Sequence, residues 1–374
     1  YISLIVFIGL LAGRKQKSTK SYFLGDGKIS WIMISFSVVA TETSVLTFLS
    51  IPGVAYITNF GFLQVAIGYI IGRIVVAWFF LPRYYSEGIQ STYQFIGNKW
   101  GVGFQRFVSS VFLIMRVLAD GVRLFMTAIP LTLITGWSFN FSILVIGLVT
   151  LIYTLIGGIR SVIYTDTFQF ILYIFGAFIT FNVINNLEPG GFSNIRSILM
   201  DANKLSIFQG LPNSIIELFT MPYNFIAAIF GGFLLSLASH GTDHLMVQRL
   251  LSAETIRDSQ KALLLSGLLV FFQFAVFLFL GAMMWVLYDG IPIKPNLLFP
   301  WFILTHLPNG FTGFLVAGIF AAAMSTLSSS INSLASATVV DWIEPLKKNA
   351  DLKTARLISI CWAIVLIGGA MLFT

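Results

Sequence analysis

Apolar segments long enough to cross a lipid bilayer recur along the whole chain, and no other feature restricts its fold as strongly. A helix crosses the hydrocarbon core with about 20 predominantly apolar residues. The segments of this kind, some of them incomplete, are residues 1–13, 29–56, 62–81, 107–134, 141–156, 162–184, 224–247, 263–288, 311–340 and 356–374. Charged residues make up only 10% of the chain, against about 25% in soluble domains. We therefore expect an all-α polytopic membrane protein, with residues 1–374 in a single transmembrane domain.

The basic residues indicate how the chain is oriented. If GRKQKSTK, residues 13–20, lies in the cytoplasm, alternation of the spans leaves only Arg196, Lys204 and Lys294 in outer loops. Arg249, which follows the span 224–247, then counts as cytoplasmic. An excess of Lys and Arg in cytoplasmic loops is typical of membrane proteins. The sequence thus predicts a multi-pass protein of the plasma (inner) membrane with residues 14–28 in the cytoplasm. It favours loops beside a lipid bilayer, rather than contact with nucleic acid, as the reason for the positive charge.

Two predicted spans are interrupted by polar residues near mid-membrane. Residues 29–56 contain ATETS at 40–44, and residues 224–247 contain Ser236, Ser239, His240 and Thr242. Broken helices at corresponding places in two halves are typical of inverted-repeat transporters, whose site lies at the bilayer midplane. The second of these spans comes five spans after the first along the chain. Because each span reverses the direction of the chain across the membrane, an odd number of steps gives the two halves opposite orientations. The alternative is that the two helices are kinked independently for structural reasons.

A third span, near the C-terminal end, carries hydroxyl groups in its middle. In VAGIFAAAMSTLSSSINS, residues 316–333, Ser325, Ser328 and Ser329 share one helical face. Ala322 lies one turn earlier, so its carbonyl points toward the hydroxyls of Ser325 and Thr326. Neutral oxygen donors of this kind suit a weakly held cation such as Na⁺. Close packing of membrane helices, which also favours small residues, is the alternative interpretation.

Charged side chains inside the spans form a second candidate cluster. Arg116, Asp120 and Arg123 lie on one face of the span 107–134. Asp120 can pair with one of the two arginines. The other would need a further acid, for which Glu42 is a candidate, or the carboxylate of a solute bound through two parallel hydrogen bonds. The alternative is a structural ion-pair network. Arg73 stands alone in its span and supports no prediction.

The sequence does not favour an enzyme. His240 and His244 have a spacing that could hold a metal, but no other His or Cys lies near them in sequence. The single cysteine, Cys361, cannot form a thiolate metal site or a disulfide framework. No pattern of nucleophile and base is recognisable.

Four segments, in this order, resemble those of the sodium:solute symporters, the family of sodium–glucose, iodide, monocarboxylate, proline and sialic acid transporters. They are FLSIPGVAY (48–56), IYTLIGGIRSVIYTDTFQF (152–170), SHGTDHLMVQRLLSA (239–253) and FAAAMSTLSSSINSLASATVVDWIEP (320–345). The resemblance implies a five-plus-five inverted-repeat (LeuT-type) core with an extra N-terminal helix. Residues 1–28 would be that helix and a cytoplasmic loop, 29–184 the first repeat, 185–223 an external segment and 224–374 the second repeat, with its C-terminal part missing. A functional monomer is implied.

The same resemblance implies two sodium sites. The shared sodium would lie between the carbonyls of Ala40, Thr43 and Ala322 and the hydroxyls of Ser325 and Thr326. Some members of the family hold a second sodium, for which the matching residues here are Asp166, Ser325, Ser328 and Ser329. Asp166 has an alternative role as a helix cap.

The solute site implied by the resemblance lies beside the first sodium. The matching positions are Glu42, Ser44, Thr47, Gln64, Ser236 and Ser239, with His240 adjacent and Arg123 as the candidate for a carboxylate. Glu42 differs from the Asn, Ser or Thr expected there. It could accept sugar hydroxyls, bind a cation, exchange a proton or pair with an arginine.

The predicted function is sodium-coupled import of a small polar solute by alternating access. A sugar is favoured by Glu42 and Gln64, and an organic anion such as a monocarboxylate or sialic acid by Arg116 and Arg123. A sensory domain of a signalling protein and a proton-coupled carrier using Glu42 or Asp166 are the alternatives.

Overall fold

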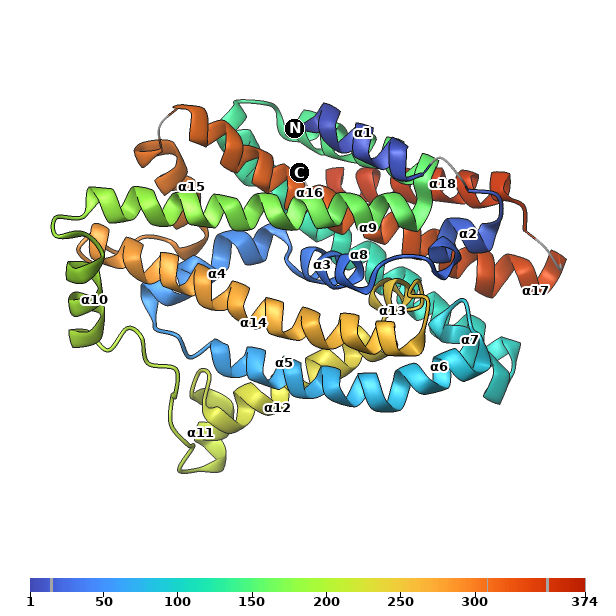
Figure 1. Cartoon of the computed structure of the whole chain (residues 1–374), viewed down its shortest axis with the longest axis horizontal. Coiled ribbons are helices and arrows are strands. Elements are labelled where there is room, and N and C mark those ends of the chain that lie inside the picture. Colours follow the sequence, from blue (N-terminus) through green and yellow to red (C-terminus); the bar gives the residue numbers. More distant parts are fainter. Residues whose placement is uncertain (14–15, 308, 348–349, 374) are drawn as a thin grey trace.

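The computed structural model describes residues 1–13, 16–307, 309–347 and 350–373, so that positions 14 and 15 of the predicted cytoplasmic segment lie outside it. Across the described residues the chain is a bundle of helices with one isolated β-bridge, between Ile29 and Ala253 (Figure 1). The fold is therefore all-α, as the sequence predicts.

The helices up to residue 187 are α1 (Ile2–Ala12), α2 (Thr19–Leu24), η1 (Gly25–Gly27), α3 (Trp31–Glu42), α4 (Val45–Ile57), α5 (Leu63–Val75), η2 (Val76–Phe80), α6 (Leu81–Glu87), α7 (Thr92–Trp100), α8 (Val102–Thr135) and α9 (Phe139–Leu187). The later ones are α10 (Gly191–Asp201), α11 (Ile215–Thr220), α12 (Phe225–Ser236), η3 (Leu237–Thr242), α13 (His244–Leu250), α14 (Ile256–Leu287), α15 (Pro295–His306), α16 (Asn309–Ala337), η4 (Thr338–Ile343), α17 (Glu344–Lys347) and α18 (Leu352–Met371).

Both spans with polar centres are broken. Helix α3 ends at Glu42, and Ser44 caps α4 by accepting a hydrogen bond from Thr47 N (3.4 Å). In the second half, Asp243 interrupts the helix and caps α13 by accepting from Leu245 N (3.0 Å). An Asp or Ser cap favours a new helix start because it satisfies donors that the first turn leaves free. The structure therefore shows both breaks at the polar residues where the sequence predicts them.

The predicted spans 141–156 and 162–184 are joined in one element, α9. It bends sharply at Gly158, whose φ is 55° and ψ −148°. A side chain there would be strained, and a Cβ would lie 2.2 Å from the Tyr22 carbonyl oxygen. A bend at one glycine thus takes the place of the loop expected between the two spans. The segment that contains Tyr22 packs against this bend.

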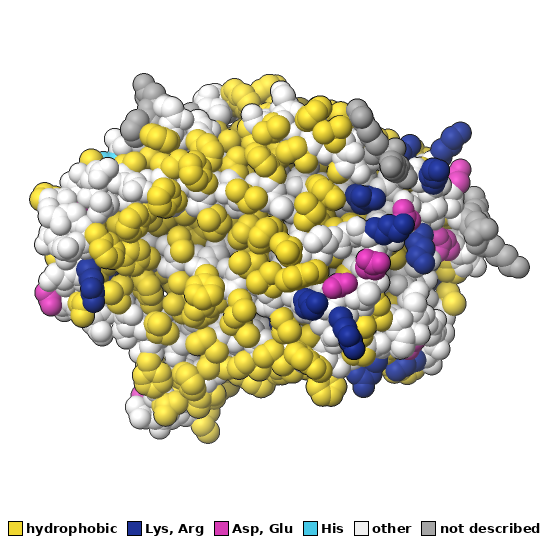
Figure 2. Space-filling view, viewed as in Figure 1, with side chains coloured by type: hydrophobic (Ala, Val, Ile, Leu, Met, Phe, Trp, Pro, Cys, Tyr) yellow, Lys and Arg dark blue, Asp and Glu magenta, His cyan; other side chains and the backbone are white. Residues whose placement is uncertain are grey.

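Five helices of the described chain are long and apolar enough to cross a membrane: Leu63–Glu87, Phe139–Leu187, Phe225–Thr242, Ile256–Leu287 and Leu352–Met371. The span 29–56 falls into two shorter helices because of its break, and the 34-residue α8 carries Arg116, Asp120 and Arg123 in its middle. Figure 2 shows hydrophobic side chains over most of one face, with Lys and Arg gathered toward the end where α2, α6 and α17 lie. The chain is a multi-pass membrane protein.

Glycines set the closest approach between helices. A Cβ at Gly68 of α5 would lie 2.2 Å from the Ile229 carbonyl oxygen of α12. We expect Gly68→Val to force these helices apart and to lower the thermal unfolding midpoint, since overpacking typically costs about 1–3 kcal/mol. Thermal unfolding in detergent measures the effect. Gly103→Val is the matched control, because a Cβ at Gly103 meets nothing within 4 Å. Equal losses in the two variants would contradict the prediction.

Candidate functional site

The break between α3 and α4 exposes backbone oxygens. The amide of Ser44 would ordinarily bind the Ala40 carbonyl, but it donates to the Glu42 carbonyl instead (3.0 Å). Thr47 N, the ordinary partner of the Thr43 carbonyl, donates to the Ser44 side chain (3.4 Å). The break therefore redirects the donors that would occupy these two carbonyls, which are the ones predicted to bind sodium.

Helix α16 faces this break. Ala322 and Ser325 are fully buried, and the Thr326 hydroxyl donates to the Ala322 carbonyl (3.2 Å). The Thr41 and Ser329 hydroxyls lie 3.2 Å apart, which places α3 directly against α16. A cavity of about 10 Å³ beside the break is lined by Ser44, Ala322 and Thr326, among others. This is close to the space that one water molecule requires. The structure thus places Ala322 and Thr326 beside Ser44 at the break, while the Ser325 hydroxyl donates to Asp166 (2.7 Å). That the carbonyls of Ala40 and Thr43 complete a sodium site with them stays a prediction.

The residues predicted for a second sodium also meet, although with an unexpected neighbour. Asp166 is fully buried in α9, and its carboxylate accepts from Ser37 (2.6 Å), Ser325 (2.7 Å) and Thr41 (3.3 Å). Ser328 and Ser329 donate to the Ser325 carbonyl at 3.0 and 2.6 Å. The guanidinium of Arg249 lies among them, with Nη2 3.3 Å from Asp166 Oδ2.

The position of Arg249 corrects the sequence-based prediction. It is fully buried rather than in a cytoplasmic loop, because α13 continues to Leu250 and Asp166 compensates its charge. No pattern in the local sequence distinguishes this arginine from the solvent-exposed ones around it.

A polar cavity of about 220 Å³ lies beside the breaks of both helices. Five predicted solute positions line it, namely Glu42, Arg123, Ser236, Ser239 and His240. Its other lining residues are Thr41, Tyr69, Arg116, Leu235, Asp243, Leu245 and Met246. Ser44 lines the small cavity instead. Thr47 and Gln64 line neither one, since Thr47 lies in the first turn of α4 and Gln64 donates to the Tyr223 carbonyl (2.7 Å).

Glu42, which lines this cavity, pairs with a different arginine from those of α8 that the sequence suggested. Glu42 pairs with Arg73 of α5, which is fully buried and also donates to Ser266 of α14 (2.9 Å). His240 Nε2 lies 3.8 Å from the same carboxylate. Arg73 points inward where α5 packs against α14, and α14 in turn packs against α3, which carries Glu42. The pairing of Glu42 with the arginines of α8 was wrong.

Those arginines use other acids. Arg116 pairs with Asp243 and lies 3.5 Å from Asp120. Arg123 lies 3.2 Å from Asp120, which also accepts from the Ser330 hydroxyl. The Arg123 side chain is 40% exposed and lines both cavities. A guanidinium has five N–H donors, and in the described part of the chain only one side-chain bond, from Nη1 to Asp120, engages this one.

Two other polar atoms in the cavity wall lack partners. Among the described residues, Ser236 Oγ and His240 Nε2 are buried and make no hydrogen bond. His240 donates or accepts at Nδ1 with Ser239 (2.8 Å). Both residues line the polar cavity, where a polar ligand group could satisfy these two atoms. His244 lies elsewhere, between Thr92 and Ser336.

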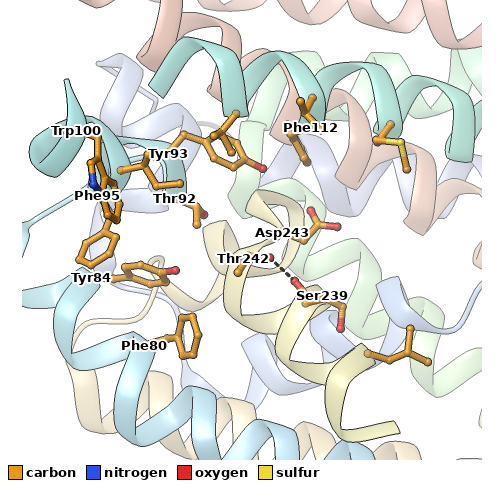
Figure 3. Close-up of a pocket in the computed structure, with 16 residues that line it drawn as sticks. Phe80, Tyr84, Thr92, Tyr93, Phe95, Trp100, Phe112, Ser239, Thr242 and Asp243 are labelled. Atoms are coloured by element: carbon orange, nitrogen blue, oxygen red, sulfur yellow. Dashed lines mark hydrogen bonds between the residues drawn. The ribbon is translucent and has the colours of Figure 1, made fainter. Parts of the chain in front are cut away.

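A third cavity, of about 640 Å³, is mostly apolar (Figure 3). Phe80 and Tyr84 of η2 and α6, Phe112 of α8 and Ser239 of η3 belong to its walls. Its apolar lining does not suit a polar solute.

Comparisons with known proteins agree with this geometry. The model of the sodium:solute symporter family matches residues 22–374. The sodium/sialic acid symporter NanT of Aliivibrio fischeri is 30% identical over 358 residues, covering 93% of this chain and 69% of that protein. The sodium/sialic acid symporter SiaT of Proteus mirabilis is 29% identical, covering 96% and 74%. Human sodium-coupled monocarboxylate transporter 2 is 26% identical, covering 92% and 56%.

A solved structure shows the same architecture. It is the substrate-bound outward-open state of a Na⁺-coupled sialic acid symporter, with a TM-score of 0.88 and 26% identity, covering 100% of this chain and 80% of that one. The likeness extends over both broken helices and over α16. On the family match and on these relatives, the chain belongs to the sodium:solute symporter family.

Proposed function

We propose that the solute of this sodium-coupled symporter is a small organic anion with at least one further polar group, bound between Arg123 and the Glu42–His240 side of the polar cavity. Sodium-coupled symport of a small solute follows from the family. The observation that carries the choice of an anion is Arg123, because its exposed guanidinium lines both cavities and keeps donors for a second carboxylate. Arginine binds carboxylates through two parallel hydrogen bonds.

The rest of the cavity supports a hydroxylated solute. The partnerless Ser236 Oγ and His240 Nε2 lie in its wall with Glu42, whose charge Arg73 compensates. A ligand hydroxyl can donate to the carboxylate and accept from the serine or histidine. A volume of about 220 Å³ is below the roughly 300–1,000 Å³ of pockets for drug-sized ligands. Both relatives named for sialic acid and the one named for monocarboxylates carry anions.

Sodium would bind where the broken helix meets α16. We assign it to the carbonyls of Ala40, Thr43 and Ala322 and the hydroxyls of Ser325 and Thr326. Ser44 lines a cavity with Ala322 and Arg123, so the ion and the anion would be close neighbours. Their opposite charges and the shared α3–α4 break give a physical reason why each would favour binding of the other.

The alternatives receive less support. Glu42 and Asp166, the acids available for proton coupling, are each paired with an arginine. We propose no enzymatic activity. We also propose that residues 16–28 face the cytoplasm of a cell with this protein in its inner (plasma) membrane, because Lys and Arg gather at that end (Figure 2), and that the lipid-embedded monomer is the functional unit.

A binding screen tests the proposed function. Purified protein would be titrated with monocarboxylates, sialic acid and neutral sugars, each with sodium and with choline in its place. We expect anions to bind in sodium and much more weakly in choline. Binding of neutral sugars alone, or uptake that follows a proton gradient without sodium, would contradict the proposal.

Thr326→Ala tests the sodium site directly. Loss of the hydroxyl is expected to weaken sodium binding roughly 10- to 100-fold, because interactions with charged groups contribute about 1.5–3 kcal/mol. Equilibrium binding of radioactive sodium measures the effect. Ser333→Ala, which removes a buried hydroxyl bonded to the Ser330 carbonyl of the same helix (3.2 Å), is the control. An unchanged sodium affinity in Thr326→Ala would refute the assignment.

A further inference from the structure

Arg249 occupies the place where a second cation would bind. It extends from α13 and is fully buried. Its Nε donates to Ser37 (3.0 Å) and its Nη1 to the Leu245 carbonyl (2.7 Å). Its Nη2 donates to Asp166 (3.3 Å) and to the Ser329 hydroxyl. Each of its three nitrogens thus has a partner, and one of them engages two of the oxygens predicted for a second sodium.

The arginine joins four helices at one point. Ser37 and Thr41 come from α3, Asp166 from α9, Ser325 and Ser329 from α16, and Arg249 from α13. Among the described residues, Arg249 is the only cation that forms an ion pair with Asp166. The carboxylate is therefore satisfied without any sodium, and the guanidinium supplies the positive charge that the site requires.

Sodium cannot share these oxygens with the guanidinium. A bound sodium needs the lone pairs of Asp166 and Ser329 at coordination distance, and Arg249 donates to both. Two positive charges a few ångströms apart in a buried, poorly solvated place also repel strongly. One of them must leave when the other binds.

We propose that Arg249 is a tethered cation that alternates with sodium at Asp166, so that sodium binds there only by displacing the guanidinium. The inference rests on the proposed sodium coupling, and of the first site's residues it shares only Ser325, whose hydroxyl donates to Asp166. Displacement would break the bonds that Arg249 makes to α3, α9 and α16 together, while its bond to the Leu245 carbonyl within α13 can persist. Sodium at Asp166 would therefore weaken the attachment of α13, which would still be bonded to α16 through His244 and Gln248.

The test is the affinity of sodium that depends on Asp166. Radioactive sodium would be titrated onto purified wild-type protein and Arg249→Met, with Asp166→Asn in each background to identify the Asp166-dependent ion. We expect this ion to bind at least tenfold more tightly in Arg249→Met, and Arg249→Lys to stay near the wild type because it keeps a charge. Arg257→Met, which removes an exposed arginine of α14, is the control. An equal or lower Asp166-dependent affinity in Arg249→Met would overturn the proposal.

A second measurement uses the wild-type protein, so it tests the proposal even if Arg249→Met fails to fold. Phenylglyoxal modifies accessible arginines, and peptide mass spectrometry would quantify the product at Arg249 and at exposed Arg257. We expect sodium to increase modification of Arg249 relative to choline and to leave Arg257 unchanged. Modification of Arg249 that does not respond to sodium would overturn the inference. An unchanged sodium affinity in Thr326→Ala, by contrast, would count against the proposed first site alone.

Discussion

Replacing Arg123 by glutamine is expected to weaken binding of the anionic solute by about 10- to 150-fold, since hydrogen bonds to charged groups contribute about 1.5–3 kcal/mol. The fold should survive, because Asp120 keeps Arg116 at 3.5 Å and the Ser330 hydroxyl. Isothermal titration of the best carboxylate from the screen, in saturating sodium, measures the change. Because Arg123 is partly exposed, the loss of affinity is expected to be smaller than that from breaking a fully buried ion pair.

Two further variants sharpen this result. Arg123→Lys keeps the charge but not the planar fork, so an intermediate loss is expected if the carboxylate binds in two-pronged geometry. Arg257→Gln alters an exposed arginine far along the chain and should leave affinity unchanged. Full affinity in Arg123→Gln would show that the carboxylate binds elsewhere, with Arg116 as the remaining arginine of the cavity wall.

The second large effect concerns stability. Asp166→Ala is expected to destabilise the protein by about 3–5 kcal/mol, because it leaves the charge of Arg249 buried and unpaired. It also removes the acceptor of Ser37 and Ser325. Thermal unfolding in detergent, without sodium, measures the loss.

The double variant Asp166→Ala/Arg249→Met distinguishes the ion pair from simple packing. Removing both charges should restore much of the stability that the single variant loses, since an apolar pair of similar volume often replaces a buried ion pair without cost. If the double variant is as unstable as Asp166→Ala, the destabilisation comes from the lost hydroxyl contacts and not from the charge of Arg249.

The sequence predicts the break at ATETS and the hydroxyl face of residues 316–333 for a physical reason. Polar groups within an apolar span are costly unless they serve a site or a partner, so they stand out against the apolar background. The two breaks and the facing helix could therefore be located from the sequence. The same reasoning does not locate α7 and α15, which lie at the ends of spans, nor the bend at Gly158, where one glycine replaces a loop.

Partner choice within the site could not be predicted. Arg73, Arg116 and Arg123 are chemically equivalent candidates for Glu42, and only helix rotation and contact decide among them. Arg249 escapes notice because a basic residue after an apolar span is typical of a cytoplasmic loop. Gln64 matches a family position, yet its amide is turned to the Tyr223 carbonyl by the packing of α5. These outcomes depend on contacts between residues distant in sequence.

The charge of the cargo determines how uptake would respond to membrane potential, because the four ion pairs of the site add no net charge. These pairs are Glu42 with Arg73, Asp120 with Arg123, Asp166 with Arg249 and Asp243 with Arg116. One sodium with one monocarboxylate is also neutral overall. Transport in that ratio carries no current, whereas each additional sodium carries one elementary charge and gains about 2.3 kcal/mol per 100 mV. The current that accompanies uptake is therefore a direct measure of how many sodium ions travel with each anion.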